Sequence, residues 1–152
     1  MDPVYPPLPA WSRATPYRVG LTSYVIPDDI LPNARALAGR IQDIELVFFE
    51  SPDFSNLPEA SVIRELAELG REQDLTYTVH FPIDRKMGSP DLRERRAFLD
   101  QAKRIVDLCR PLDPYAYLLH LEGVTGADTP ARVGQWRDDL VPLLNEFAGH
   151  VP

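Results

Sequence analysis

The chain has 152 residues, of which 44% are hydrophobic and 26% are charged, values that are typical of one globular domain. Acidic residues outnumber basic residues by 23 to 16, and the resulting net charge of −7 argues against nonspecific binding to nucleic acid or to an anionic membrane. The single cysteine excludes an internal disulfide, and neither a signal peptide nor a membrane-spanning stretch is visible, so we expect a cytoplasmic protein.

Prolines recur through residues 1–16. Proline fixes φ and removes a backbone donor, so this segment is predicted to be an extended arm rather than a helix or a strand. A regular alternation of strand and helix patterns begins at Tyr17, and we take residues 17–152 as the folded domain.

The strands of the first two strand–helix units are predicted at residues 17–24 and 43–50. Asp29 is a plausible N-cap for the first helix, with Pro32 in its first turn. Residues 43–50 are largely apolar, as a strand buried on both faces requires. The second helix is predicted over residues 58–73.

The third and fourth strands are predicted at residues 75–81 and 115–121. Ser89-Pro90 reads as an N-cap followed by the first helical residue, and Thr129-Pro130 repeats this signature before the last helix. Pro142 is expected to kink the last helix or to divide it in two.

Four strand–helix units in succession indicate an α/β fold with a parallel sheet and right-handed crossovers. One candidate is a (βα)4 half of a TIM barrel, with the helices on the outer face of the four-stranded sheet. The other is a doubly wound sheet, but the chain has neither Gly-x-Gly-x-x-Gly after the first strand nor a P-loop. A complete barrel needs about 250 residues. We therefore expect the N-terminal half of a longer TIM-barrel protein, with open sheet edges that favour homodimerisation.

Two histidines mark the ends of neighbouring predicted strands. His80 ends the third strand and His120 lies near the end of the fourth. Because neighbouring strands lie about 4.8 Å apart, the two imidazoles can converge on one divalent ion such as Zn, Mn or Fe. Glu122 and Glu50 stand at the same end of the predicted sheet and could add carboxylate oxygens. A hydrogen-bonded polar role is the alternative for each of these side chains.

Arg85 and Lys86 follow the third predicted strand and therefore belong to the same rim. A guanidinium and an ammonium there could hold a phosphate, although a solvated loop is the plainer interpretation. Ser23, near the end of the first strand, is a weaker candidate for substrate contact.

Several segments together resemble a known superfamily. They are residues 20–33 (GLTSYVIPDDILPN), 43–46 (DIEL), 78–82 (TVHFP), 110–114 (RPLDP) and 120–123 (HLEG). These segments resemble the xylose-isomerase-like TIM barrels, which include sugar-phosphate isomerases and apurinic endonuclease-type phosphodiesterases. The IPDDILPN and RPLDP stretches most resemble its cobamide-remodelling phosphodiesterase branch.

The resemblance implies metal-assisted chemistry at the carboxyl rim of the barrel. It assigns His80 and His120 to metal or substrate binding, and it implies that Arg85 or Lys86 binds the phosphate of the substrate. The cobamide-remodelling branch cleaves the phosphodiester between the corrin side chain and the lower nucleotide loop. The superfamily places further ligands, including a carboxylate that ends strand 5, in the second half of the barrel.

The sequence thus predicts the N-terminal half of a metal-dependent phosphodiesterase that acts on cobamides. A sugar or sugar-phosphate isomerase or epimerase on the same fold is the second hypothesis. A non-catalytic half-barrel that serves as an assembly module is the third. In the first two cases the partner is a small-molecule substrate, rather than nucleic acid or membrane.

Overall fold

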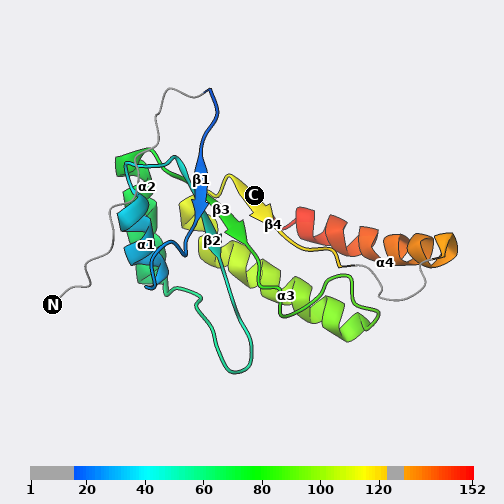
Figure 1. Ribbon diagram of the computed structural model, residues 1–152. Coiled ribbons are helices and arrows are strands. Elements are labelled where there is room, and N and C mark those ends of the chain that lie inside the picture. Colours follow the sequence, from blue (N-terminus) through cyan, green and yellow to red (C-terminus); the bar gives the residue numbers. More distant parts are fainter. Residues whose placement is uncertain (1–15, 123–128) are drawn as a thin grey trace.

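The computed structural model describes residues 16–122 and 129–152 (Figure 1). Apart from Pro16, the expected proline-rich arm lies outside the described residues. The described chain folds into four parallel strands and four longer helices that alternate along the sequence. The strands are β1 (Gly20–Thr22), β2 (Asp43–Val47), β3 (Thr76–His80) and β4 (Ala116–Leu118). The helices are α1 (Ile30–Leu37), α2 (Ala60–Gln73), α3 (Leu92–Cys109) and α4 (Pro130–Ala148), with a 3-10 turn at Arg110–Leu112.

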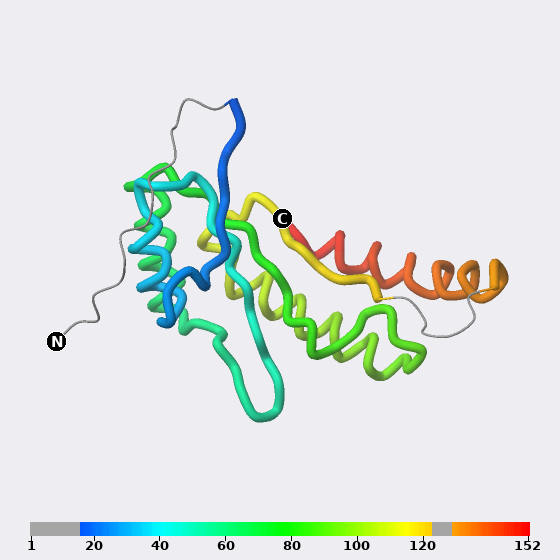
Figure 2. Tube along the Cα trace, viewed as in Figure 1, coloured from blue at the N-terminus to red at the C-terminus, as the bar shows by residue number. Residues whose placement is uncertain are grey.

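The strand order distinguishes the two architectures that the sequence left open. The order is β1-β2-β3-β4, so each strand pairs in parallel with the next one along the chain. Each helix contacts the next helix, which places the helices on one face, and α1 and α2 lie side by side (Figure 1). The trace in Figure 2 follows this progression from β1, in blue, to β4, in yellow. A doubly wound sheet reverses its strand order at a switch point, whereas a barrel does not. The fold is a (βα)4 half-barrel.

The pleat of the central strands separates an apolar face from a polar one. Alternate residues of β2 and β3 are fully buried, among them Ile44, Leu46 and Val79, which join the core formed with the helices. The residues between them, including Thr78 and His80, are only half-buried. This second face lies opposite the helices and corresponds to the inside of a barrel. The sequence predicted that β2 is buried on both faces. The face toward the helices is fully buried, and the opposite face is only half-buried.

The helices bury one stripe each against the sheet. Ala34 and Leu37 of α1, Leu66 of α2, and Leu99 and Cys109 of α3 are at most 1% exposed. Each fully buried Leu side chain contributes about 1.5–3 kcal/mol relative to an exposed one. Cys109 is fully buried on the inner side of α3, and burial raises the pKa of its thiol to about 12.

Several boundaries differ from the sequence predictions. β2 ends at Val47 and β4 at Leu118, so neither Glu50 nor His120 belongs to a strand. α3 begins after Asp91, whose carboxylate accepts a hydrogen bond of 2.8 Å from the backbone of Arg93. An aspartate with this geometry is a better N-cap than the expected Ser89, which lies two residues earlier.

The division of the last helix at Pro142 was wrong, because α4 is one continuous helix. Proline removes the hydrogen bond to the carbonyl four residues earlier, that of Asp138. Both Pro142 and Asp138 lie on the exposed side of α4. Water can satisfy that carbonyl, so the helix continues despite the missing bond.

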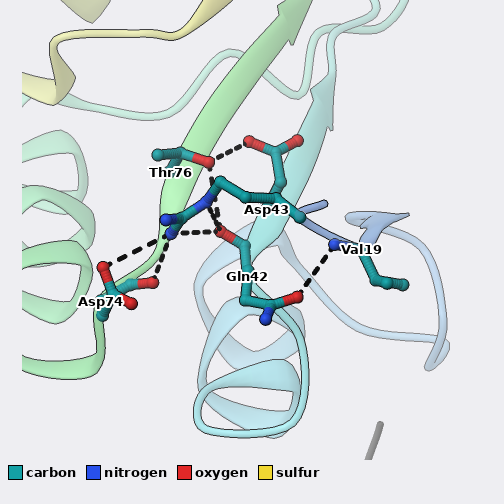
Figure 3. A network of polar contacts seen from close by, with 6 residues as sticks. Val19, Gln42, Asp43, Asp74 and Thr76 are labelled. Carbon is teal, nitrogen blue, oxygen red and sulfur yellow. Dashed lines mark hydrogen bonds and ion pairs between the residues drawn. The ribbon is translucent and has the colours of Figure 1, made fainter. Parts of the chain in front are cut away.

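A polar network ties the amino ends of the first three strands together (Figure 3). The side chain of Gln42 accepts a hydrogen bond of 2.9 Å from the backbone of Val19, and its backbone carbonyl accepts one of 3.1 Å from the Thr76 hydroxyl. Arg18 donates to the same carbonyl at 3.0 Å and to the Asp74 carbonyl at 2.6 Å. Because these bonds join segments that are distant in sequence, they fix the register of β1, β2 and β3.

Replacing Gln42 by Ala should lower the free energy of unfolding by about 1–2 kcal/mol, since it leaves the Val19 N–H without its acceptor. Urea denaturation followed by circular dichroism measures this change. Gln135→Ala is the matched control, because Gln135 lies exposed on α4 and bonds only across one helical turn to Asp139. Equal stability of the two variants would contradict the proposal that the Gln42 hydrogen bonds fix the register of the strands.

Candidate functional site

His80 is the last residue of β3 and lies on the face opposite the helices. Its Nδ1 is 2.9 Å from the carbonyl oxygen of Phe81. A carbonyl oxygen can only accept, so Nδ1 carries the proton and donates it, and Nε2 is left with its lone pair. A histidine whose Nδ1 is held by a backbone carbonyl is the arrangement typical of metal ligands that bind through Nε2.

His120 meets His80 across the rim, although it stands two residues beyond β4. The backbone pairing of β3 and β4 continues past the strands, with the Phe81 N–H donating to the Leu118 carbonyl at 3.0 Å. The two Nε2 atoms are 3.0 Å apart, and the ring centroids are 5.0 Å apart. Because the lone pair of His80 Nε2 faces it, His120 Nε2–H donates a hydrogen bond to His80 Nε2. Two nitrogens that both lie about 2.1 Å from one ion are roughly 3.0 to 3.4 Å apart, so a divalent ion fits this pair in place of the proton.

The histidine pair is not a complete metal site in the part of the chain that the structure describes. Across residues 16–122 and 129–152, no group of three or more His, Cys, Asp or Glu side chains could hold a metal ion. Structural and catalytic zinc sites use at least three protein ligands. Two imidazoles therefore supply part of a coordination shell.

Lys86 and Glu122 form an ion pair beside the histidines, with Nζ and Oε2 2.5 Å apart. The hydrogen bond to Glu122 and the charge of Glu122 raise the pKa of Lys86, and the charge of Glu94 adds to the effect. The side chains are about half exposed, so the pair adds little to stability. Its effect is to hold a carboxylate and an ammonium at fixed positions on the rim.

A close backbone contact positions Glu122. A Cβ atom at Gly88 would collide with the carbonyl of Glu122, so the two segments meet only because residue 88 is glycine. The indole Nε1 of Trp136, on α4, donates to the Gly88 carbonyl at 3.1 Å. Nothing in the spacing of Gly88, Glu122 and Trp136 along the chain indicated this contact.

Four of the residues proposed from the sequence share one small pocket, which we call the rim pocket. Its lining consists of Arg85, Lys86, His120 and Glu122 together with Pro82, Ile83 and Phe98. His80 adjoins it through His120. The pocket thus combines imidazole, carboxylate and two cationic side chains. These side chains fill it so closely that no water-sized group fits inside, so an anion would bind only after they move apart.

Glu50 is turned away from this pocket. Its carboxylate accepts hydrogen bonds from Gln101 Nε2 at 2.7 Å and from Arg104 Nη2 at 3.3 Å, both on α3. The sheet-like bridge from Glu50 to Ser55 turns the chain back beyond β2. The structure therefore attaches Glu50 to the outer helix layer and does not bring it to the histidines.

Ser23 is fully buried, and its hydroxyl oxygen accepts a hydrogen bond of 3.2 Å from the backbone of Val47. Its own N–H donates to the Glu45 carbonyl at 2.9 Å. These bonds join the ends of β1 and β2. The structure thus gives Ser23 a bonding partner in the sheet, and its contact with a substrate stays a prediction.

Comparison with known proteins shows which other proteins share this fold. A family profile described as xylose isomerase-like TIM barrel matches residues 35–151. The solved structure of a D-tagatose 3-epimerase-like protein is similar, with 18% sequence identity and a TM-score of 0.63 over 88% of this chain and 48% of that one. D-psicose 3-epimerase from Clostridium cellulolyticum H10, solved with D-tagatose, gives 17% identity and a TM-score of 0.65 over the same shares. The chain thus spans about half the length of these neighbours. The sequence has no significant match among curated proteins.

The helices of the described ranges were also compared with the requirements of a bilayer. None of them combines the length and the apolar character that a membrane span needs.

Replacing Glu122 by Gln should lower the pKa of Lys86 toward its ordinary value, because the carboxylate is the largest cause of the increase. NMR titration of the lysine side chains measures this change. Glu94→Gln should lower the same pKa by less, since Glu94 acts through its charge alone. A Lys86 pKa that is unchanged in Glu122→Gln would show that the ion pair does not form in solution.

Proposed function

The chain belongs to the xylose isomerase-like TIM barrel family, and from this premise we propose that it forms half of the catalytic rim of a metal-dependent phosphodiesterase. The observation that carries the proposal is the histidine pair, with its Nε2 atoms 3.0 Å apart and its His80 Nδ1 held by a backbone carbonyl. This pair is prepared to share one cation. The activity of the whole protein is part of the proposal, since the chain covers 48% of its structural neighbours.

His80 and His120 would hold the divalent ion, whether Mn, Zn or Fe. When bound, such an ion supplies a Lewis acid and a water of lowered pKa for attack on the phosphorus. The remaining ligands would come from outside the described residues. Glu122, which lines the rim pocket with His120, would accept a proton from the attacking water or complete the ligand set.

Arg85 and Lys86 support the phosphodiester over an uncharged substrate. Both line the rim pocket with His120, so an anionic group there would lie next to the histidine pair. Lys86 is paired with the Glu122 carboxylate in this structure, so its ammonium would have to be shared between that carboxylate and a phosphate oxygen. Arg85 can add a planar fork of donors to phosphate oxygens.

Cobamides are the proposed substrate class, and the reaction would hydrolyse the phosphodiester of the nucleotide loop. Support for this finer assignment comes from the sequence resemblance of the IPDDILPN and RPLDP segments to the cobamide-remodelling branch. Glu50 as a further catalytic carboxylate remains part of the proposal, but it would have to leave Gln101 and Arg104 first.

The second candidate is a sugar epimerase, which the two structural neighbours favour by their names. The same histidine pair would then hold a cation next to a substrate carbonyl, and Glu122 would remove and return the proton on the neighbouring carbon. A cluster of two cationic side chains has no evident use on a neutral ketose. For this reason we rank the phosphodiesterase first.

Isothermal titration with Zn²⁺ or Mn²⁺ should show one weak site on the wild-type chain, because only two ligands converge in the described residues. His80→Ala and His120→Ala should each weaken binding at least about tenfold. His150→Ala is the matched control, since His150 lies near the chain end and pairs with Asp107 instead. Equal affinities for all three variants would exclude the histidine pair as the metal ligands.

The reaction itself is tested on the complete barrel that contains this chain, incubated with a cobamide or with a ketohexose. We expect release of the nucleotide loop, loss of activity in a chelator, and recovery on adding the metal. His80→Ala and His120→Ala should lower kcat by about a hundredfold or more. Epimerised ketose without cobamide cleavage would replace the first proposal by the second.

A further inference from the structure

A second pocket lies at the same edge of the sheet but at the carboxyl ends of β1 and β2. We call it the Tyr24 pocket. Its lining comes from Tyr24, Asp28, Asp29 and the start of α1, and from residues 54–58 and Val62 of the next loop and helix. Its volume is ≈ 430 Å³, which is within the roughly 300–1,000 Å³ of small-molecule sites. The chemistry proposed for the rim pocket makes no use of it.

Two aromatic rings face this pocket. Tyr24 is 42% exposed and Phe54 is 59% exposed, so each presents a ring surface that the core does not cover. Tyr24 also packs against Phe49, with ring centroids 5.8 Å apart, which restricts its orientation. Exposed, oriented aromatic side chains on the wall of a concave site favour stacking with a flat ring.

Polar groups converge on the hydroxyl of Tyr24. Asn56 is held by its bonds to the Val47 carbonyl, at 3.0 Å, and from the Phe49 N–H, at 2.6 Å. Its amide also donates to the Tyr24 oxygen, which leaves the Tyr24 proton for a second partner. Burial raises the pKa of Tyr24, and the charge of Asp29 adds to this increase, while the Asn56 bond opposes it.

Asp29 has a carboxylate that the helix does not use. It occupies the N-cap position of α1, yet its side chain makes no capping hydrogen bond. Together with Asp28 it makes the Tyr24 pocket acidic. This charge repels phosphate and favours a neutral group that brings hydroxyl donors. The lining of the Tyr24 pocket therefore differs in charge from that of the rim pocket, where two cationic side chains accompany one carboxylate.

The two pockets belong to one continuous rim. The Glu50 N–H donates to the Asp84 carboxylate at 3.3 Å, which joins the loop after β2 to the loop after β3. From the β1–β2 pair to the β3–β4 pair is two strand spacings, or about 10 Å. A nucleoside and its attached phosphate can bridge that separation.

We propose that the Tyr24 pocket binds the nucleoside part of the phosphodiester substrate. The aromatic base stacks on Tyr24 and Phe54, and the ribose hydroxyls donate to Asp29. A free sugar offers the hydroxyls without the flat ring and so uses half of the pocket. This inference rests on the proposed function, because it assigns the phosphate of the same substrate to Arg85 and Lys86.

Adenosine is the probe, with binding to the full 152-residue chain measured by NMR and titration calorimetry. Phe54→Ala should weaken binding at least about fivefold, the lower end of the effect of losing one base–aromatic stack. Asp29→Asn should weaken it by about fivefold through the lost charge-assisted bond. Tyr115→Ala and Asp100→Asn are the matched controls, an exposed aromatic and an exposed acid outside the Tyr24 pocket, and they should bind as the wild type does.

Circular dichroism checks that each variant is folded, and Phe54→Leu replaces Phe54→Ala if that variant unfolds. Absence of saturable adenosine binding to the wild type would overturn the proposal, as would equal affinities for Phe54→Ala and Tyr115→Ala. Tighter binding of D-tagatose than of adenosine would overturn the nucleoside assignment. Adenosine affinity that is unchanged in His80→Ala, where metal binding is lost, separates the two proposals and supports the Tyr24 pocket.

Discussion

The alternation of side chains along β2 and β3 is the constraint on which the rest of the structure depends. Residues such as Leu46 and Val79 face the helices and are fully buried, and the residues between them face the other way. His80 belongs to the second set, so its imidazole cannot reach the helix layer without shifting the strand register by one residue. Such a shift would expose the apolar face, and the hydrophobic free energy of the core therefore fixes the direction of the catalytic candidate.

This dependence explains which features could be predicted from the sequence. The strand–helix alternation and the rim position of His80 follow from periodic patterns, because one-face burial leaves a period of two in the strands. The orientations of Glu50 and Ser23 follow from loop geometry and from hydrogen bonds to distant segments. No local pattern encodes such bonds. The effect of Pro142 was also hard to predict from the sequence. It depends on whether the backbone carbonyl that loses its hydrogen bond can reach water.

Charge is distributed unevenly along the rim despite the net charge of −7. The rim pocket contains Arg85 and Lys86 beside the single carboxylate of Glu122, whereas the turn after β1 contributes Asp28 and Asp29 to the Tyr24 pocket. At about 10 Å, these two groups of charges are more than one Debye length apart in physiological salt, so each acts mainly on the part of a ligand that contacts it. In the proposed binding mode, a substrate with one anionic and one neutral end would therefore bind the rim in a single preferred orientation.

The metal role that we propose for the histidine pair needs only the geometry of this half of the barrel. Among the described residues, β1 pairs only with β2 and β4 only with β3, so both outer edges of the sheet are open. His80 is oriented by a bond to its own neighbour, Phe81, and that orientation needs no further strand. Under the proposed function, the entropy of placing these two ligands would be lost during folding of this half, and the remaining ligands would bring the rest of the binding free energy. Affinity should consequently rise steeply when the second half of the rim is added, because each new ligand joins a pair that is already in position.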